Sequence, residues 1–134
     1  MDSNTYEESL IEAREILEVT AVQMAAERRS PENLLSIQIA QDVFCEQSLD
    51  QLDAIEEDLL FHLEVVSAGK NKVLKSLYLK IFPDLFELFN QIKGREKKQS
   101  FEAIAEHDSI IEHISKQNKE AAAEAMRLHL RNDH

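Results

Sequence analysis

The sequence predicts an all-α fold, an antiparallel bundle of about six helices. Only two of the 134 residues are glycine and two are proline, so few positions interrupt regular structure. Apolar residues recur at helical spacing through most of the chain, and no segment has the alternation that marks a strand. With 43% apolar residues, a chain of this length can bury one substantial core, so we expect a single domain.

Composition excludes several classes of protein. The formal net charge of -11 argues against nucleic-acid binding by this chain alone, because phosphate contacts need clustered Lys and Arg. The single cysteine, Cys45, excludes a framework of internal disulfides. We find neither a signal peptide nor an apolar run long enough to span a bilayer. The expectation is a cytoplasmic protein that does not enter membranes.

The first helix should begin after Thr5, whose hydroxyl and the following acids form a capping start, and run to about Arg29. Ser30 and Pro31 then predict a break and a new start, as N-cap and first helical residue. We expect this second helix to end near Cys45. The apolar stripe of the first helix consists of Leu10, Leu17, Ala21 and Met24.

Arg14 lies on the apolar stripe of the first helix. A guanidinium on the core side needs an anionic partner. That partner is either Glu18, one turn further along, or the anion of a bound ligand. Both interpretations stay open at this point.

The third helix carries two polar residues on an inward stripe. We expect Ser48 to cap this helix and Leu52 to be among its apolar contacts. The stripe is Ile55, Asp58, His62 and Val65. A turn at Gly69 to Asn71 separates this helix from a fourth one rich in large apolar residues, which Pro83 should kink or interrupt near Phe82. The fourth helix is either a central core helix or one with a second face for a subunit partner.

The last two helices repeat this pattern. After a solvated polar loop at Lys93 to Lys98, the fifth helix has histidine on its inner stripe, and Asn118 caps a sixth helix that has another. These stripes are Ile104, His107, Ile111 and Ile114 in the fifth helix, and Ala122, Ala125 or Met126, and His129 in the sixth. We expect the remaining histidines, His113 and His134, to face solvent.

Four polar residues on three inward stripes predict a metal site. Asp58 and His62 are spaced i and i+4 on one helix face. Because the turn between the last two helices is short, these helices must pack antiparallel, which brings His107 and His129 to similar heights. Three imidazoles and one carboxylate suit Zn, Ni, Fe, Mn or Co. The alternative is that each histidine is an ordinary core residue that donates to a backbone carbonyl.

The order of these motifs resembles the C-terminal effector-binding (FCD) domain of GntR-type transcriptional regulators, in the branch typified by the fatty-acid-responsive regulator. The matching pieces are Glu12 to Glu18, Met24 to Arg28, Asp58 to His62, Asn71, Glu106-His107 and Ala121 to Leu130. None of these segments is specific to the family by itself, but their occurrence in this order is. The family has Gly directly before the Asn, where this chain has Lys70.

The resemblance implies an all-helical bundle around a central metal and ligand cavity, spanning residues 5–132. It implies that Asp58, His62, His107 and His129 hold a divalent metal, with zinc favoured over nickel, manganese or iron. It further implies that Arg14 and Asn71 bind a small organic-acid effector. The domain would sense the effector and form a homodimer. DNA binding would require a winged helix-turn-helix domain, which this chain lacks.

Two other classes of function are compatible with the residues. A site of three histidines and one aspartate with open positions is able to activate water or dioxygen, as in a metal-dependent enzyme. Against this, the nearest additional acids, Glu18 and Glu106, have simpler explanations, so we do not expect an enzyme. A helical interaction module without metal is the third possibility.

Overall fold

The computed structural model describes residues 5–50, 53–91 and 98–133, and every regular element among them is helical. The predicted all-α class is therefore confirmed. Leu52, the polar segment 93–97 and His134 lie outside the described residues. The helices are α1 Tyr6–Arg28, α2 Pro31–Leu49, α3 Ile55–Ala68, α4 Lys72–Gln91, α5 Lys98–Ser115 and α6 Lys119–Asn132.

Four of the predicted helix starts carry the expected side-chain caps. Thr5 and Glu8 form a reciprocal capping box at α1, and Ser30 accepts a hydrogen bond from the third backbone amide of α2. Asn71 and Asn118 cap α4 and α6 in the same way. Each cap satisfies a backbone N–H that the first turn of a helix leaves without a partner, so these positions fix where the helices begin.

The boundary between the second and third helices differs from the prediction. α2 continues past Cys45 to Leu49, so Ser48 lies inside α2 and caps nothing. α3 begins only at Ile55, and its N-cap position, Ala54, makes no side-chain hydrogen bond. Because neither glycine nor proline occurs between positions 32 and 68, no residue forces α2 to stop at the predicted point.

α4 runs through Pro83 as one continuous helix, so of the two expected effects of this proline near Phe82, a kink or an interruption, the interruption is wrong. Proline removes one backbone hydrogen bond. The residues on either side are anchored in the core, Tyr78 and Leu85 being fully buried, which holds the helix together across that gap.

The α3–α4 turn depends on two neighbouring residues. A Cβ at Gly69 would lie 3.1 Å from the carbonyl oxygen of Ala21 and 3.2 Å from Met24 Cβ, so glycine permits the close approach of α1 to the end of α3. The left-handed conformation, with φ of 57°, falls on Lys70. This is the position where the regulators that the sequence resembles usually have glycine, which adopts that conformation without strain.

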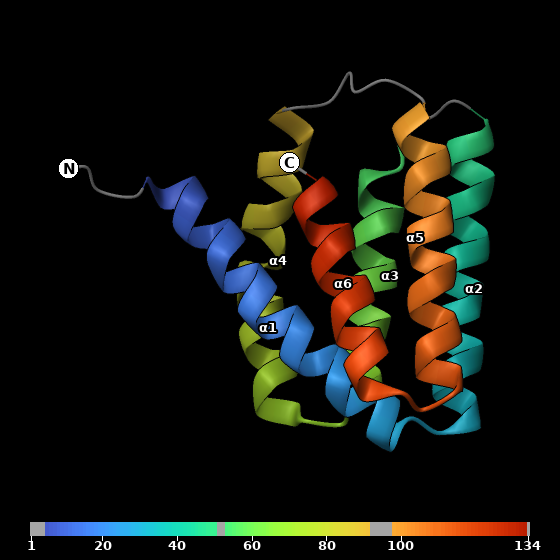
Figure 1. The fold of residues 1–134 in the computed structure, drawn as a ribbon. Coiled ribbons are helices and arrows are strands. Elements are labelled where there is room, and N and C mark those ends of the chain that lie inside the picture. The colour runs from blue at the N-terminus through green and yellow to red at the C-terminus, as the bar shows by residue number, and fades with distance from the viewer. Residues whose placement is uncertain (1–4, 51–52, 92–97, 134) are drawn as a thin grey trace.

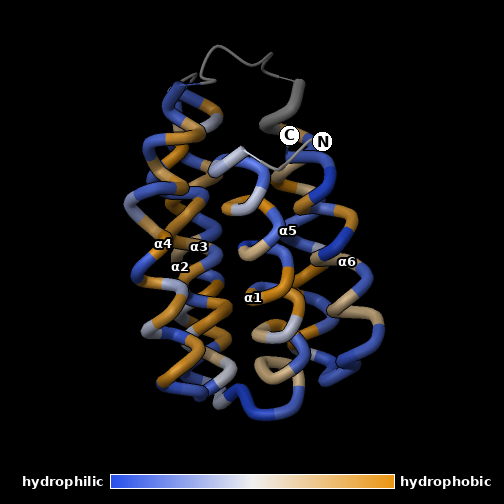
Figure 2. The backbone as a smooth tube through the Cα atoms, turned by 90° about the vertical axis from the view of Figure 1, so that its left-hand side faces the viewer, coloured by the Kyte–Doolittle hydropathy of each residue, from blue (hydrophilic) through white to orange (hydrophobic). Residues whose placement is uncertain are grey.

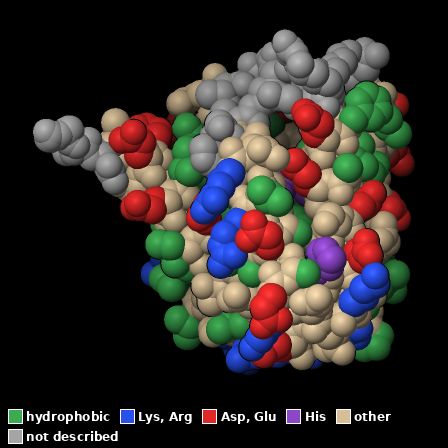
Figure 3. Space-filling model, in the orientation of Figure 1, with side chains coloured by type: hydrophobic (Ala, Val, Ile, Leu, Met, Phe, Trp, Pro, Cys, Tyr) green, Lys and Arg blue, Asp and Glu red, His purple; other side chains and the backbone are tan. Residues whose placement is uncertain are grey.

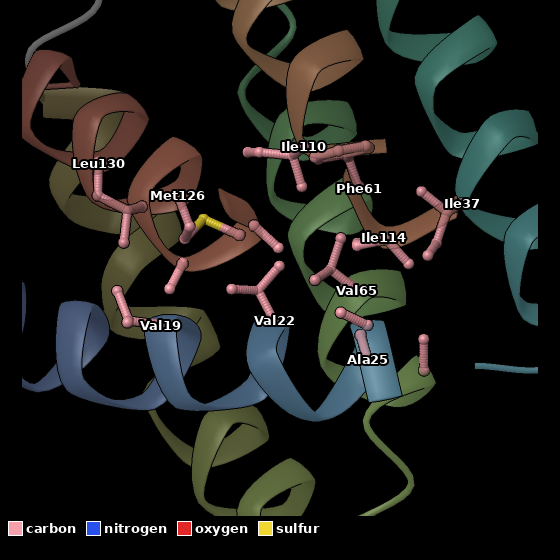
Figure 4. Packing of buried hydrophobic residues seen from close by; sticks show 14 residues of the cluster. Val19, Val22, Ala25, Ile37, Phe61, Val65, Ile110, Ile114, Met126 and Leu130 are labelled. Carbon is pink, nitrogen blue, oxygen red and sulfur yellow. The ribbon is translucent and has the colours of Figure 1, made fainter. Parts of the chain in front are cut away.

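α1 lies obliquely across the other helices and packs against α3, α4, α5 and α6 (Figure 1). Two apolar clusters result, one on each side of α1. The larger joins α1, α2, α3, α5 and α6, and Figure 4 shows its side chains converging from these five helices. The smaller joins α1 and α3 to α4. The polar residues of the predicted site come from the helices that form the larger cluster.

The helix phase within α5 is shifted slightly from the prediction. Ile110 and Ile114 are fully buried, whereas Ile104 and Ile111 are half-buried. Apolar residues recur along every helix of the backbone tube in Figure 2. In the described part of the chain, none of the helices combines the length and apolarity needed to cross a membrane.

Candidate metal centre

α3 supplies an acid and an imidazole one turn apart. His62 is completely buried and the Asp58 side chain is 20% exposed, with its Oδ1 atom 3.4 Å from His62 Nε2. Both lie on the predicted inward stripe with Val65, which is buried in the larger core cluster. Helix packing therefore directs a carboxylate into the protein, where it needs a cationic partner.

The two predicted histidines of α5 and α6 reach the same point. His107 Nε2 lies 2.9 Å from Asp58 Oδ1, and His129 Nε2 lies 3.1 Å from His62 Nε2. Both histidines are fully buried. One donor atom from each of the four residues lies within 4.8 Å of all the others, so the structure brings together the four predicted ligands.

The donor atoms fit a shared cation better than they fit each other. Within the described part of the chain, neither of the buried atoms Asp58 Oδ1 and His107 Nε2 has a hydrogen-bond partner, although the two lie only 2.9 Å apart. Separations of 2.9 to 3.4 Å resemble those between ligands that each lie ~2.0–2.2 Å from one ion. Three nitrogens and one oxygen form a donor set suited to zinc, nickel, iron or manganese.

Each histidine is oriented by an acceptor on the ring nitrogen that faces away from the centre. The Nδ1 atoms of His62, His107 and His129 lie 2.5, 2.7 and 2.6 Å from side-chain oxygens. An acceptor at Nδ1 keeps the proton there and leaves the lone pair of Nε2 free for a metal. These acceptors are, in the same order, Glu18, Gln41 and Glu106.

Arg14 belongs to a buried network attached to His62. Its Nε donates to Glu18 Oε2 at 2.7 Å, which confirms the predicted pairing of Arg14 with Glu18. The hydroxyl of Tyr78 donates to the same oxygen at 2.8 Å, and Arg14 Nη1 reaches Asp133 at 3.1 Å. Arg14 Nη2 is buried and makes no hydrogen bond with any residue that the structure describes, so one donor remains for an anion.

Charges in this network shift the pKa values of its members in opposite directions. Burial alone would raise the pKa of Glu18, but His62 and Arg14 outweigh it and lower that pKa to about 2. Burial would lower the pKa of His62, but the Glu18 carboxylate raises it to about 9. Burial lowers the pKa of His107 to about 4. Despite its burial, Asp58 has a pKa well below its usual range because His62 and His107 favour the carboxylate.

These pKa values predict that the stabilisation by metal grows between pH 6.5 and 9. A pKa of about 9 in the fold, against 6.5 unfolded, means that His62 stabilises the metal-free protein below pH 6.5 and loses this contribution as the pH rises through 9. Metal binding must displace that proton, so the affinity should rise ~10-fold per pH unit in this range. With a pKa of about 2, Glu18 is ionised throughout the range from pH 6.5 to 9 and therefore adds nothing to the pH dependence of metal affinity.

Melting temperatures measured with one equivalent of zinc and with a chelator test this expectation. The difference between the two should widen from pH 6.5 to 9 in the wild type and in a His113→Gln control, which alters a histidine outside the cluster. A difference that is constant or narrows with rising pH would contradict it.

The remaining predicted residues lie elsewhere. Asn71 caps α4 through Leu74 N, and its amide nitrogen is 3.9 Å from Met24 Sδ. The structure gives it no contact with the cluster, so its role at the ligand site stays a prediction. His113 is half-buried, with Nδ1 inaccessible and without a hydrogen-bond partner, so its expected exposure to solvent is only partly correct.

Sequence reasoning did not identify the residues that orient the histidines. Glu18 carried one signal, its i+4 spacing from Arg14 on an inward stripe. Glu106 was considered only as a possible acid, and Gln41 not at all. An uncharged glutamine in a helix has no distinctive pattern, and its partner, His107, lies 66 positions further along the chain.

Together, fold and site define a class, the all-helical bundle with a buried centre of three histidines and one aspartate. A family model described as the FCD domain matches residues 9–132. The chain belongs to the FCD domain family, as its resemblance to the effector domains of GntR-type regulators predicted.

Two similar proteins extend this finding. The HTH-type transcriptional regulator LutR of Bacillus subtilis (strain 168) is 30% identical over 127 residues, which are 92% of this chain and 58% of LutR. The chain thus spans little more than half the length of that relative. The solved structure of E. coli McbR/YncC superposes with a TM-score of 0.75 at 17% identity, over 98% of this chain and 68% of that one. This likeness concerns the fold.

Proposed function

We propose that this chain is the metal-containing, ligand-sensing domain of a GntR-type transcriptional regulator. The observation that carries the proposal is the convergence of three Nε2 atoms and Asp58 Oδ1 on one buried point, each imidazole being held by its own acceptor. Similarity to LutR supports a regulatory role. A bound divalent ion, with zinc favoured over nickel, manganese or iron, would supply a Lewis-acidic contact for an anionic ligand.

The proposed effector is a small organic acid. One of its carboxylate oxygens would bind the metal, and Arg14 would bind the acid through its free Nη2 donor. A buried guanidinium whose other nitrogens already contact Glu18 and Asp133 is well ordered, which favours planar anions. Asn71, at the α3–α4 turn, remains part of the proposed ligand site from family resemblance.

Effector binding would act by shifting a population of helix arrangements. Arg14, His62 and Tyr78 all contact Glu18, so a change at the metal reaches α4 through one carboxylate. In a dimeric regulator, moving this helix would change the spacing of two attached winged-helix domains. Such domains would bind the DNA, and a regulator of this kind would act in the cytoplasm. On the face of this chain that Figure 3 shows, Lys and Arg side chains are interspersed with Asp and Glu side chains, so DNA binding is proposed for the attached domains and not for this face.

A homodimer through α4 is part of this proposal. Among the described residues, α4 packs only against α1 and α3 and leaves large apolar side chains exposed. Leu79 and Phe86, seven positions apart, share one side of this helix, and Val73 and Leu77, four positions apart, share another, so each pair is available to a subunit interface. Sedimentation of the intact protein as a monomer at all concentrations would exclude it. The exposed residues are Val73, Leu77, Leu79 and Phe86.

An enzymatic role is less well supported by the geometry. The two acids closest to the cluster, Glu18 and Glu106, are engaged with His62 and His129 and therefore serve to orient ligands. A general base must instead reach the reacting proton. Turnover of a candidate acid by metal-loaded protein would favour the enzyme over the sensor.

Thermal-shift screening against small mono-, di- and tricarboxylates tests the sensing function. We expect at least one acid to raise the melting temperature of the zinc-loaded protein, since saturation at 100 times Kd adds ~2.7 kcal/mol of stability. The shift should disappear after chelation and shrink in Arg14→Lys, which keeps the charge but loses the fork of donors. Stabilisation that is equal with and without metal would contradict a metal-bound effector.

A further inference from the structure

Gln41 connects α2 to the candidate metal centre in one fixed orientation. The residue is 1% exposed. Its amide nitrogen donates to the carbonyl oxygen of Ile104 at 3.2 Å and to Asp108 Oδ1 at 3.0 Å. Because both acceptors require the nitrogen, the amide oxygen must face His107, where it lies 2.7 Å from Nδ1. Gln41 therefore keeps the proton of His107 on Nδ1 and directs Nε2 toward Asp58.

Gln41 differs in charge from the other two acceptors. His62 and His129 are held by carboxylates, whereas His107 is held by a neutral amide. A carboxylate makes the stronger hydrogen bond and increases the basicity of an imidazole that binds metal. His107 is therefore the histidine whose bond to a metal the protein strengthens least.

The neutral amide also affects the balance of charge around the centre. A divalent ion and Arg14 would together carry three positive charges. Carboxylates already outnumber these charges, so a further one at position 41 would make the centre more negative. An entering anion would then meet stronger repulsion in a buried site, where charges are poorly screened. The carboxylates already present belong to Glu18, Asp58, Glu106, Asp133 and, in contact with Gln41, Asp108.

We propose that Gln41 is a positioning residue that sets the balance between metal affinity and anion affinity at this centre. Its oxygen orients His107 for the metal, and its neutrality limits the repulsion that an anionic ligand meets at the site. The effect of Gln41 on metal affinity follows from the hydrogen-bond geometry alone. Its effect on anion affinity rests on the proposed sensing function.

The decisive variant adds a carboxylate at position 41 and relieves its contact with Asp108, while its contact with the Ile104 carbonyl oxygen remains. In Gln41→Glu alone, the new acid would face Asp108, so it is combined with Asp108→Asn, and Asp108→Asn alone is the reference. Zinc affinity is measured by competition with a chromophoric chelator, and acetate and citrate affinity by calorimetry on zinc-loaded protein. We expect zinc affinity to rise ~10-fold, within the range for residues behind the ligands, and carboxylate affinity to fall ~10-fold.

Opposite changes in the two affinities are the signature of the proposal. Unchanged or weaker zinc binding in the double variant, or changes of the same sign for zinc and carboxylate, would overturn it. The matched control is Gln38→Glu, which adds the same charge on the exposed face of α2. It should alter neither affinity more than twofold. If the reference protein binds no carboxylate, the proposed sensing function is contradicted, while the zinc affinities still test whether Gln41 controls metal binding.

A second variant covers the case in which the added acid prevents folding. Gln41→Met has similar volume but removes the acceptor, so zinc affinity should fall ~10- to 100-fold. Nitrogen chemical shifts of the histidine side chains should show His107 losing its fixed Nδ1–H form in the metal-free protein. Retention of both the zinc affinity and this tautomer in the Met variant would overturn the assignment.

Discussion

Asp58→Ala should reduce the metal content of the purified protein from about one divalent ion per chain to nearly none. Asp58 is the only anionic donor among the four, and its Oδ1 atom faces the Nε2 atoms of His62 and His107 at 3.4 and 2.9 Å. Removing a direct ligand should cost more than the 10- to 100-fold typical of residues behind the ligands, so we expect at least ~100-fold weaker zinc binding. Elemental analysis of protein purified without added metal measures the result.

Melting temperatures in chelator separate this loss of metal from a general loss of stability. With chelator present, Asp58→Ala and the wild type are both metal-free, so their difference reports the fold alone. Zinc should raise the melting temperature of the wild type and of His113→Ala, but not that of Asp58→Ala. A normal zinc-induced rise in Asp58→Ala would exclude the proposed centre. Asp58→Asn tests whether the charge itself is required.

The fold was predictable because its signals are local. Caps at Thr5, Ser30 and Asn118 and the turn at Gly69 each act within a few residues, and the structure has all four. The end of α2 was missed for the same reason. Because no helix-breaking residue follows Pro31 before the end of that helix, only tertiary packing determines where the helix stops, and no single residue in the sequence specifies that packing.

The four clustered residues were predictable because each interrupts an apolar stripe. An inward polar residue needs a partner, and four of them on three helices restrict where those partners are. The acceptors behind them follow no such rule. Glu106 is adjacent in sequence to His107 and yet orients His129, 23 positions away on the neighbouring helix. Identifying it requires the rotation of two packed helices, which periodicity alone does not fix.

Glu18→Gln should lower the free energy of unfolding by about 3–5 kcal/mol, the cost of breaking a buried ion pair by removing one of its partners. Glu18 is completely buried and accepts from Arg14, Tyr78 and His62. Its loss leaves Arg14, itself 2% exposed, with Asp133 as its remaining ion-pair partner among the described residues. Urea unfolding followed by circular dichroism measures the change.

A nearby carboxylate provides the matched control for this prediction. Glu15 precedes Glu18 by three positions and pairs with Arg131 at 3.5 Å, with its side chain 34% exposed. Glu15→Gln removes the same charge from the same helix but should cost less than ~1 kcal/mol, because solvent replaces the partner. Equal losses in the two variants would show that burial of Glu18 has no energetic consequence.

A double-mutant cycle with Arg14→Met distinguishes the two roles of Glu18. Removing both charges should restore much of the stability lost in Glu18→Gln, because the buried guanidinium that loses Glu18 is no longer present. Zinc affinity should not recover, since His62 Nδ1 still lacks its carboxylate acceptor. If both quantities recover together, Glu18 affects the metal only through the stability of the fold. If stability recovers and zinc affinity stays ~10- to 100-fold low, Glu18 orients a metal ligand directly.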